Sequence, residues 1–199
     1  MIKVLYLLVS LLSFVGVSIG VYKIAQFYAN RIEINLIKDA VLQDHKGHSW
    51  QISKLKENIG IIYFGYTSCP DICPNALNNL SITLADMGKE REIFQPIFVS
   101  VDPDRDTPDI IKSYIGNFDS KIIGLTGTEA QLKSFSWFFG ASYSLRKSEN
   151  QSMDYVVDHS ANFFLVTSAG NYVMLPVKDN WDDLKALLLR STNRIIEQN

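Results

Sequence analysis

The longest apolar run of the chain comes first and differs from all later ones. Between Lys3 and Lys23 lie 19 residues without a charge. At a rise of about 1.5 Å per residue, a helix of this length spans roughly 28 Å, close to the hydrocarbon core of a bilayer. We therefore predict a membrane anchor and tether over residues 1–30, with a single transmembrane helix. A cleaved signal peptide is the alternative, because small residues stand at Ser18 and Gly20.

Beyond the anchor, short apolar runs alternate with signals for helix starts. The runs at residues 61–66 and 96–101 are rich in β-branched and aromatic side chains, which is typical of buried strands. A helix is expected after the first run, with Pro74 at its first position, where the missing N–H costs nothing, and an end near Gly88. Its apolar stripe consists of Leu77, Leu80, Leu84 and Met87.

Two further helices are indicated by the residues that cap them. Thr107 suits an N-cap and Pro108 the first turn that follows. Thr128 and Gln131 have the spacing of a capping box, which predicts the start of a third helix.

The C-terminal part of the chain predicts a hairpin and one more helix. Residues 162–167 and 172–175 are apolar and flank a turn, and a helix is expected from about Asn180 to Arg190, with a frayed tail after it. The order of elements is strand, helix, strand, helix, helix, hairpin, helix. This order predicts an α/β fold with parallel crossovers and a final antiparallel hairpin, and it fits a thioredoxin-like domain over residues 31–199.

Composition and charge narrow the class of protein. Hydrophobic residues make up 47% and charged residues 20% of the chain, as in a globular protein rather than a disordered one. The formal net charge is −2, which does not suit a nucleic-acid binder, because such a protein needs a basic surface to neutralise phosphates. The two cysteines are too few for a disulfide framework, and a spacing of four residues indicates a redox pair or a metal site.

Cys69 and Cys73 follow a predicted buried strand and precede a predicted helix. Ligands in open α/β sheets collect at the carboxyl ends of strands. We expect Cys73 to lie at or beside the helix N-cap, where the helix dipole and unpaired N–H groups favour a thiolate. Thiolates bind soft metals and attack disulfides, so both chemistries are open to this pair. A pair of buried structural cysteines is the alternative.

His159 is the candidate for a third ligand. It stands just before the first strand of the predicted hairpin, at a connection that faces the cysteine loop in a thioredoxin-like fold. Two sulfur donors and one imidazole suit copper, since thiolates favour Cu(I) and imidazole tolerates Cu(II). Taken alone, a single histidine is more often a loop residue than a ligand.

Four phrases of the sequence carry a family resemblance. They are YFGYTSCPDICPNAL, VSVDPDRDTP, IGLTGT and VDHSANFFLV. In this order and spacing they resemble the Sco/SenC family, over roughly residues 35–190. The resemblance implies a thioredoxin-like domain on one N-terminal anchor. It also implies one copper ion, Cu(I) or Cu(II), held by the C-x-x-x-C motif and a distant histidine, which here are Cys69, Cys73 and His159.

The resemblance further implies a role in assembling the binuclear copper centre of cytochrome c oxidase. The expected partners are the copper-accepting subunit of that enzyme and other periplasmic copper chaperones. The expected location is the inner (cytoplasmic) membrane, single pass, with the soluble domain on the periplasmic side. Lys23 and Arg31 argue against this orientation, because positive residues beside a membrane span favour the cytoplasmic side. We expect a metallochaperone without catalytic turnover.

A thiol-disulfide oxidoreductase is the competing function, with Cys69 and Cys73 as a redox-active disulfide that reduces the cysteines of the copper-accepting subunit. A peroxidase is disfavoured, because the proline-flanked pair lacks the activating residues that such an enzyme needs. Two departures from the family pattern are Ser68, where many members have histidine, and the stretch 142–154, which matches no pattern.

Two other polar clusters are weaker candidates. The acidic loop at residues 102–106 is interpreted as structural and partner-facing, with Arg105 pairing its neighbours. Asp102 is a weaker candidate for orienting a copper ligand. His45 and His48 lie in a predicted turn. We interpret this turn as solvent-exposed rather than as a second metal site.

Overall fold

The computed structural model describes residues 15–26, 37–141, 143–147, 155–159, 162–176, 181 and 183–197, without the side chains of 145–147 and 155–159. The chain divides into two compact units, Met1–Leu36 and Ile37–Asn199. In the first unit, residues 15–26 are helical. Within the described ranges, no helix is both long enough and apolar enough to cross a bilayer. Much of the predicted anchor lies outside those ranges.

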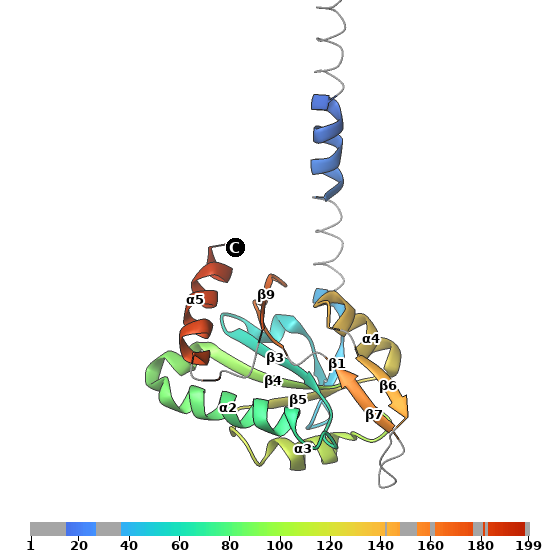
Figure 1. The fold of residues 1–199 in the computed structure, drawn as a ribbon, viewed down its shortest axis with the longest axis vertical. Helices are drawn as coiled ribbons and strands as arrows, with labels where there is room; N and C mark the ends of the chain where they lie inside the picture. Colours follow the sequence, from blue (N-terminus) through green and yellow to red (C-terminus); the bar gives the residue numbers. More distant parts are fainter. Residues whose placement is uncertain are drawn as a thin grey trace, which may run out of the picture. The chain divides into compact units, whose positions relative to one another are not determined.

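A mixed β-sheet forms the centre of the second unit (Figure 1). In the described part of the chain it has seven strands in the order β2-β1-β5-β4-β3-β8-β9. Neighbours β3, β4 and β5 are parallel, and the other pairs are antiparallel. The strands are β1 (Leu42–Asp44), β2 (Ser49–Trp50), β3 (Ile59–Gly65), β4 (Phe94–Ser100), β5 (Ile123–Thr126), β8 (Phe163–Val166) and β9 (Tyr172–Leu175). A separate two-stranded sheet contains β6 (Tyr143–Lys147) and β7 (Tyr155–His159).

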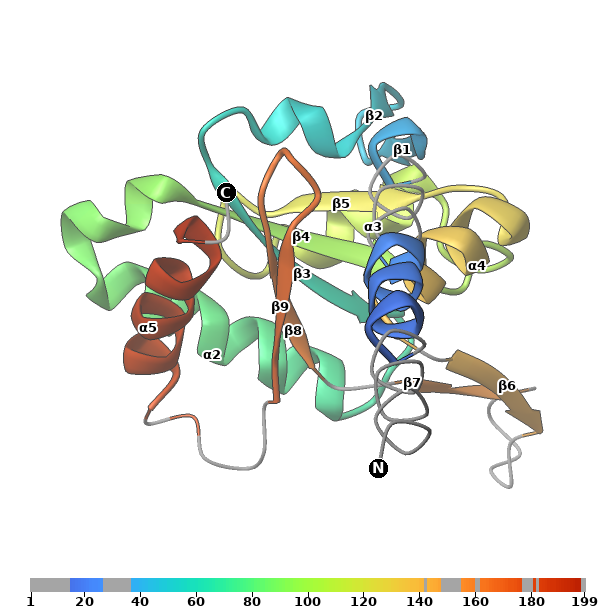
Figure 2. The ribbon, with the colours of Figure 1, turned by 90° about the horizontal axis from the view of Figure 1, so that it is seen from above.

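Helices cover both faces of the large sheet (Figures 1 and 2). They are α2 (Ile72–Asp86), α3 (Pro108–Ile115), α4 (Glu129–Phe138) and α5 (Leu184–Ile196), with short 3-10 helices η1 (Ile52–Leu55) and η2 (Gly88–Ile93). Successive side chains of a strand point to opposite faces. On β3, Tyr63 faces α2, where it contacts Cys73, and Phe64 faces α4, where its ring packs 6.1 Å from that of Phe135. Helices α2 and α4 therefore lie on opposite faces.

Most predicted elements are present, and the predicted caps are confirmed. Thr107 caps α3 with Pro108 in the first turn, and Thr128 and Gln131 form both halves of the capping box of α4. The apolar stripe of α2 is buried as expected. The hairpin β8–β9 also lies where it was predicted.

Three helix boundaries differ from the prediction. Helix α2 begins at Ile72 with Asp71 as N-cap, so Pro74 is its third residue, another position whose N–H has no partner within the helix. Helix α5 runs from Leu184 to Ile196, so it begins later than the predicted start near Asn180, and the prediction of a frayed tail from Ser191 was wrong. The apolar face continues past the predicted end, because Ile195 is as fully buried as Leu188.

Three strands were not predicted, and each has a weak local signal. Strand β5 is short and contains Gly124, a residue that usually weakens a strand. Here glycine is required by packing, because a Cβ at this position would lie 2.2 Å from Cγ2 of Ile111 on α3. Strand β6 lies within residues 142–154, the stretch that matched no pattern, and β7 directly follows it.

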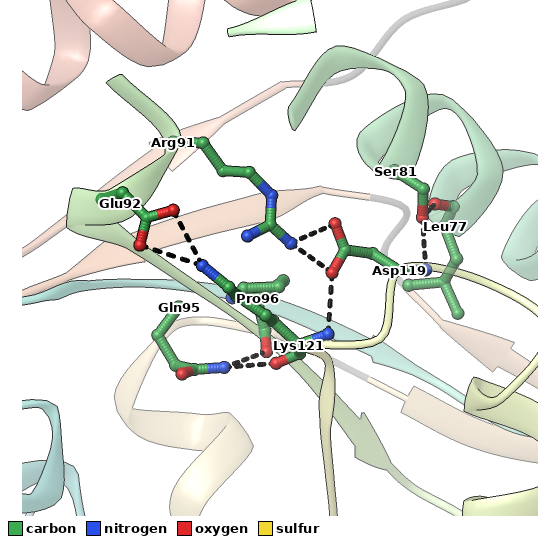
Figure 3. A network of polar contacts seen from close by, with 8 residues as sticks. All are labelled: Leu77, Ser81, Arg91, Glu92, Gln95, Pro96, Asp119 and Lys121. Atoms are coloured by element: carbon green, nitrogen blue, oxygen red, sulfur yellow. Dashed lines mark hydrogen bonds and ion pairs between the residues drawn. The ribbon is translucent and has the colours of Figure 1, made fainter. Parts of the chain in front are cut away.

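A polar network ties the amino ends of the central strands together (Figure 3). The guanidinium of Arg91 on η2 forms an ion pair with Asp119, whose side chain is 8% exposed. Lys121 pairs with Glu92 at 3.0 Å, and its carbonyl accepts a hydrogen bond from Gln95 on β4 at 2.6 Å. This network lies at the beginning of β4, at the opposite end of the strand from the cysteine loop.

Candidate metal centre

The cysteine loop leaves the carboxyl end of β3, the central parallel strand. Its path is fixed at the start, because the N–H of Val101, just after β4, donates to the carbonyl of Gly65 at 2.9 Å. The N–H of Cys69 then donates to the carbonyl of Tyr66 at 3.2 Å and closes a turn. The loop enters α2 one residue before Cys73. The predicted position of the pair, between a buried strand and a helix start, is confirmed.

The two sulfurs differ in environment. Cys73 is fully buried, whereas Cys69 is half-buried, and the two are thiols rather than a disulfide. The N–H of Cys73, in the first turn of α2, donates to Sγ of Cys69 at 3.5 Å. The helix start therefore stabilises negative charge on Cys69. The sequence had favoured Cys73 for this role, and that part of the prediction was wrong.

The surroundings of Cys73 favour its protonated form. Its hydrogen bond with the sulfur of Cys69, followed by burial, raises the pKa of the Cys73 thiol well above its ordinary value. The hydroxyl of Tyr63 also contacts this sulfur, and burial raises the pKa of Tyr63 in turn. Tyr114 on α3 lies nearby, and its pKa is raised first by burial and then by the two thiols. A metal ion that binds both sulfurs must displace the proton of Cys73.

A glycine makes room for the buried sulfur. A Cβ on Gly65 would lie 2.9 Å from Sγ of Cys73 and 3.0 Å from the ring of Phe98. The first distance is shorter than real Cβ contacts and the second is tighter than most of them, so a larger residue here would displace the thiol or the ring. The last residue of β3 is therefore part of the site, although sequence reasoning did not single it out.

His159 ends β7 and pairs in register with Tyr143 on β6. Four residues later, Phe163 pairs with Tyr63 on β3. A chain of this length reaches at most about 14 Å, so the backbone of His159 stays near the carboxyl end of β3. The side chain of His159 lies outside the described part of the structure. Its role as a ligand stays a prediction.

The described side chains contain no cluster of three histidine, cysteine or acidic residues that could hold a metal. The cysteine pair supplies two sulfur donors at the start of α2, one buried and one partly exposed to solvent. That donor set fits a soft ion such as Cu(I) and leaves at least one position for a further ligand. Metal can reach Cys69 from solvent before it engages the buried sulfur of Cys73.

The weaker candidates have structural contacts. Nδ1 of His45 accepts a hydrogen bond from the N–H of Gly124 at 3.1 Å, and burial lowers the pKa of this imidazole. His48 is 71% exposed in the turn, 3.6 Å from Asp44. The preferred interpretation of this turn as solvated agrees with these contacts.

The acidic loop has the internal ion pair that was expected. Nε of Arg105 lies 2.5 Å from Oδ2 of Asp102, and the guanidinium carbon is 5.7 Å from the ring centroid of Tyr66. Arg105 thus pairs its neighbour and also reaches the residue that begins the cysteine loop.

Comparison with known proteins identifies relatives in sequence and in fold. The SCO2-like protein of Rickettsia prowazekii is 39% identical over 132 residues, which cover 66% of this chain and 64% of that protein. The chain thus spans a little under two thirds of this relative. The crystal structure of Arabidopsis thaliana ScoI with copper bound superposes with a TM-score of 0.69 and 31% identity, covering 80% of this chain and 96% of that one.

Yeast Sco1 with copper bound gives the same TM-score of 0.69 at 32% identity, covering 77% of this chain and 86% of that one. The predicted α/β, thioredoxin-like fold class is confirmed by these structures. The profile of the SCO1/SenC family matches residues 33–191, which include the cysteine pair and His159. The chain belongs to the SCO1/SenC family.

Proposed function

We propose that this protein binds one copper ion through Cys69, Cys73 and His159. It then delivers the ion to the copper-accepting subunit of cytochrome c oxidase, for assembly of the binuclear copper centre. The observation that carries the proposal is the pair of neighbouring sulfurs at the start of α2, one buried and one partly exposed to solvent. Family membership and the copper-bound relatives support it.

The geometry of the pair suits a carrier that must both hold and release an ion. Cys69 meets solvent and accepts the N–H of Cys73, so an incoming ion finds an electron-rich sulfur first. The buried Cys73 and an imidazole from the end of β7 would then complete a three-coordinate site. A half-exposed sulfur also lets a recipient thiolate attack the ion, so that transfer proceeds through shared ligands.

Membrane attachment is part of this proposal. The charge-free run before Lys23 supports a single-pass anchor in the inner membrane, with the domain on the periplasmic side. Other periplasmic copper chaperones would supply the ion. An oxidising compartment gives copper a second effect, because bound metal keeps the two thiols from closing to a disulfide.

The test of copper binding is metal analysis and X-ray absorption of the reduced protein with one equivalent of copper. We expect one ion with two sulfur ligands and one nitrogen ligand. Cys69→Ser, Cys73→Ser and His159→Ala should each weaken binding by at least about tenfold, since water does not replace a lost ligand for a soft ion. Binding that survives unchanged in both cysteine variants would refute the proposal.

A thiol-disulfide reductase is the second candidate, and the asymmetry of the two thiols favours it specifically. Cys69 would attack a disulfide of the copper-accepting subunit, and Cys73 would resolve the mixed disulfide, leaving two thiols on the target and a Cys69–Cys73 disulfide here. A periplasmic dithiol would have to reduce that disulfide again. His159→Ala separates the candidates, because a reductase keeps its activity in this variant and a copper carrier loses affinity.

A further inference from the structure

A buried carboxylate lies directly behind the cysteine loop. Asp106, 1% exposed, accepts two hydrogen bonds from Thr67, from its N–H at 2.9 Å and from its hydroxyl at 2.6 Å. The hydroxyl of Ser100 at the end of β4 donates a third, at 2.5 Å. Thr67 and Asp106 are 39 residues apart in sequence. We call Asp106, Thr67 and Ser100 the Asp106 cluster.

The cluster holds the loop just before the first cysteine. Thr67 stands two residues before Cys69, within the turn that the Cys69 N–H closes on the carbonyl of Tyr66. The ring of Tyr66 lies beneath the guanidinium of Arg105, the neighbour of Asp106. Two consecutive residues of the cysteine loop are thus fixed by two consecutive residues of the acidic loop.

The carboxylate is itself held in place. The N–H of Asp106 donates to the carbonyl of Asp102 at 2.9 Å, and the N–H of Asp102 donates to the hydroxyl of Ser100 at 3.1 Å. Asp106 directly precedes Thr107, the N-cap of α3. Through its contacts with Asp106, Thr67 therefore links the position of Cys69 to β4 and α3.

We propose that Asp106 is a positioning residue that holds Cys69 over the first turn of α2 through Thr67. It thereby sets how tightly the dithiol retains copper and how readily it is oxidised. This inference rests on the proposed function for its copper readout. Charge-assisted hydrogen bonds inside a protein are strong and directional, and outer-shell partners of this kind typically change metal affinity by 10- to 100-fold.

Loss of the cluster should act on Cys69 alone, because Cys73 is fixed by α2. Without Thr67 as an anchor, Sγ of Cys69 would spend less time within reach of the Cys73 N–H, 3.5 Å away in the structure. The reduced pair would lose that contact, so the reduction potential should become more negative. Copper would lose one preorganised donor and dissociate faster.

The experiment compares variants of the full-length chain purified in detergent. Thr67→Val removes the hydroxyl at nearly constant volume, Asp106→Asn removes the charge, and Thr67→Ser keeps the hydroxyl as the conservative rescue. Asp119→Asn is the matched control, because it weakens the buried pair with Arg91 at the far end of β4. The readouts are the rate at which bathocuproine disulfonate removes Cu(I) and the potential in glutathione buffers.

We expect Thr67→Val and Asp106→Asn to release copper about tenfold faster and to have a more negative potential than wild type. Thr67→Ser should match wild type, and Asp119→Asn should lose stability without a change in either readout. The inference is overturned if both readouts stay at wild-type values, if the potential shifts the other way, or if Asp119→Asn shifts equally. Thr67→Val decides the matter if Asp106→Asn does not fold.

The metal-free potential also separates this inference from the proposed function. If the wild-type chain bound no copper, the proposed function would fail. The effect of Thr67→Val on the potential would still support or overturn the positioning role.

Discussion

Gly65 and Cys73 are in such close contact that a methyl group on the glycine would lie 2.9 Å from the sulfur. The two residues come from β3 and α2, so their contact sets how closely the helix start approaches the sheet. The position of the buried Cys73 thiol therefore depends on the absence of a side chain at Gly65.

Replacing Gly65 tests this contact. Gly65→Ala should push Cys73 out of position, destabilise the fold by about 1–3 kcal/mol, and weaken copper binding. Urea denaturation and Cu(I) competition measure the two effects. Gly60→Ala is the matched control, since a Cβ there would lie 2.9 Å from Val166 at the other end of β3, far from the thiols. Equal copper affinity in the two variants would contradict the prediction.

The two thiols should differ in reactivity. Cys69 is half-exposed and accepts an N–H, whereas Cys73 is buried with a raised pKa. Iodoacetamide at pH 7 to 8 should therefore modify Cys69 at least about tenfold faster, because the thiolate is the nucleophile. Peptide mass spectrometry after short reaction times gives the ratio. Modification of Cys73 first would show that the assignment of the two environments is reversed.

Stability should fall at alkaline pH because of Cys73. The folded state holds the proton of this thiol more tightly than the unfolded chain, in which the thiol titrates near its ordinary pKa of 9.0. The stabilisation is complete below that pH and is lost as the pH rises above it, by up to about 1.4 kcal/mol per pH unit. Urea titrations of metal-free protein between pH 8 and 10 measure this slope. Cys73→Ser should reduce it, and an unchanged slope would assign the loss to other groups.

The N-terminal segment should anchor the chain. The full-length protein should stay with membranes after alkaline carbonate extraction, and a fragment beginning at about residue 30 should be soluble. Leu12→Arg places a charge inside the apolar run, at a cost of about 3 kcal/mol near the bilayer centre, and should impair insertion. A released mature chain that begins near Val21 would instead identify a cleaved signal peptide.

The elements that the sequence predicted well are those with a complete local signal. The buried strands β3 and β4 are continuous apolar runs, and α3 and α4 have side-chain caps within three residues of their starts. Strand β5 escaped prediction because its glycine is explained only by Ile111 on another element. Helix α5 continued past the predicted end because its face is buried by tertiary packing.

The site shows the same division between local and long-range information. The spacing of Cys69 and Cys73 identifies a redox or metal pair without any structure. The two thiols differ in environment because one sulfur is buried beneath β3, and the spacing of the cysteines does not predict this burial. The contact between Thr67 and Asp106 joins two phrases of the sequence that are separately recognisable, but only the fold shows that they touch.

The place of β8 in the sheet has a consequence for how the protein matures. Strand β3 pairs with β4, which follows it closely in sequence, and with β8, whose Phe163 lies opposite Tyr63 from 100 residues further along the chain. Closing so long a loop is slow, so the central strand stays open on one side until late in folding. Cys69 and Cys73 are synthesised well before the strand that completes the pairing of β3. An oxidant that met the chain at this stage would find the two thiols beside an incompletely paired strand, so strand pairing and disulfide formation would compete in time.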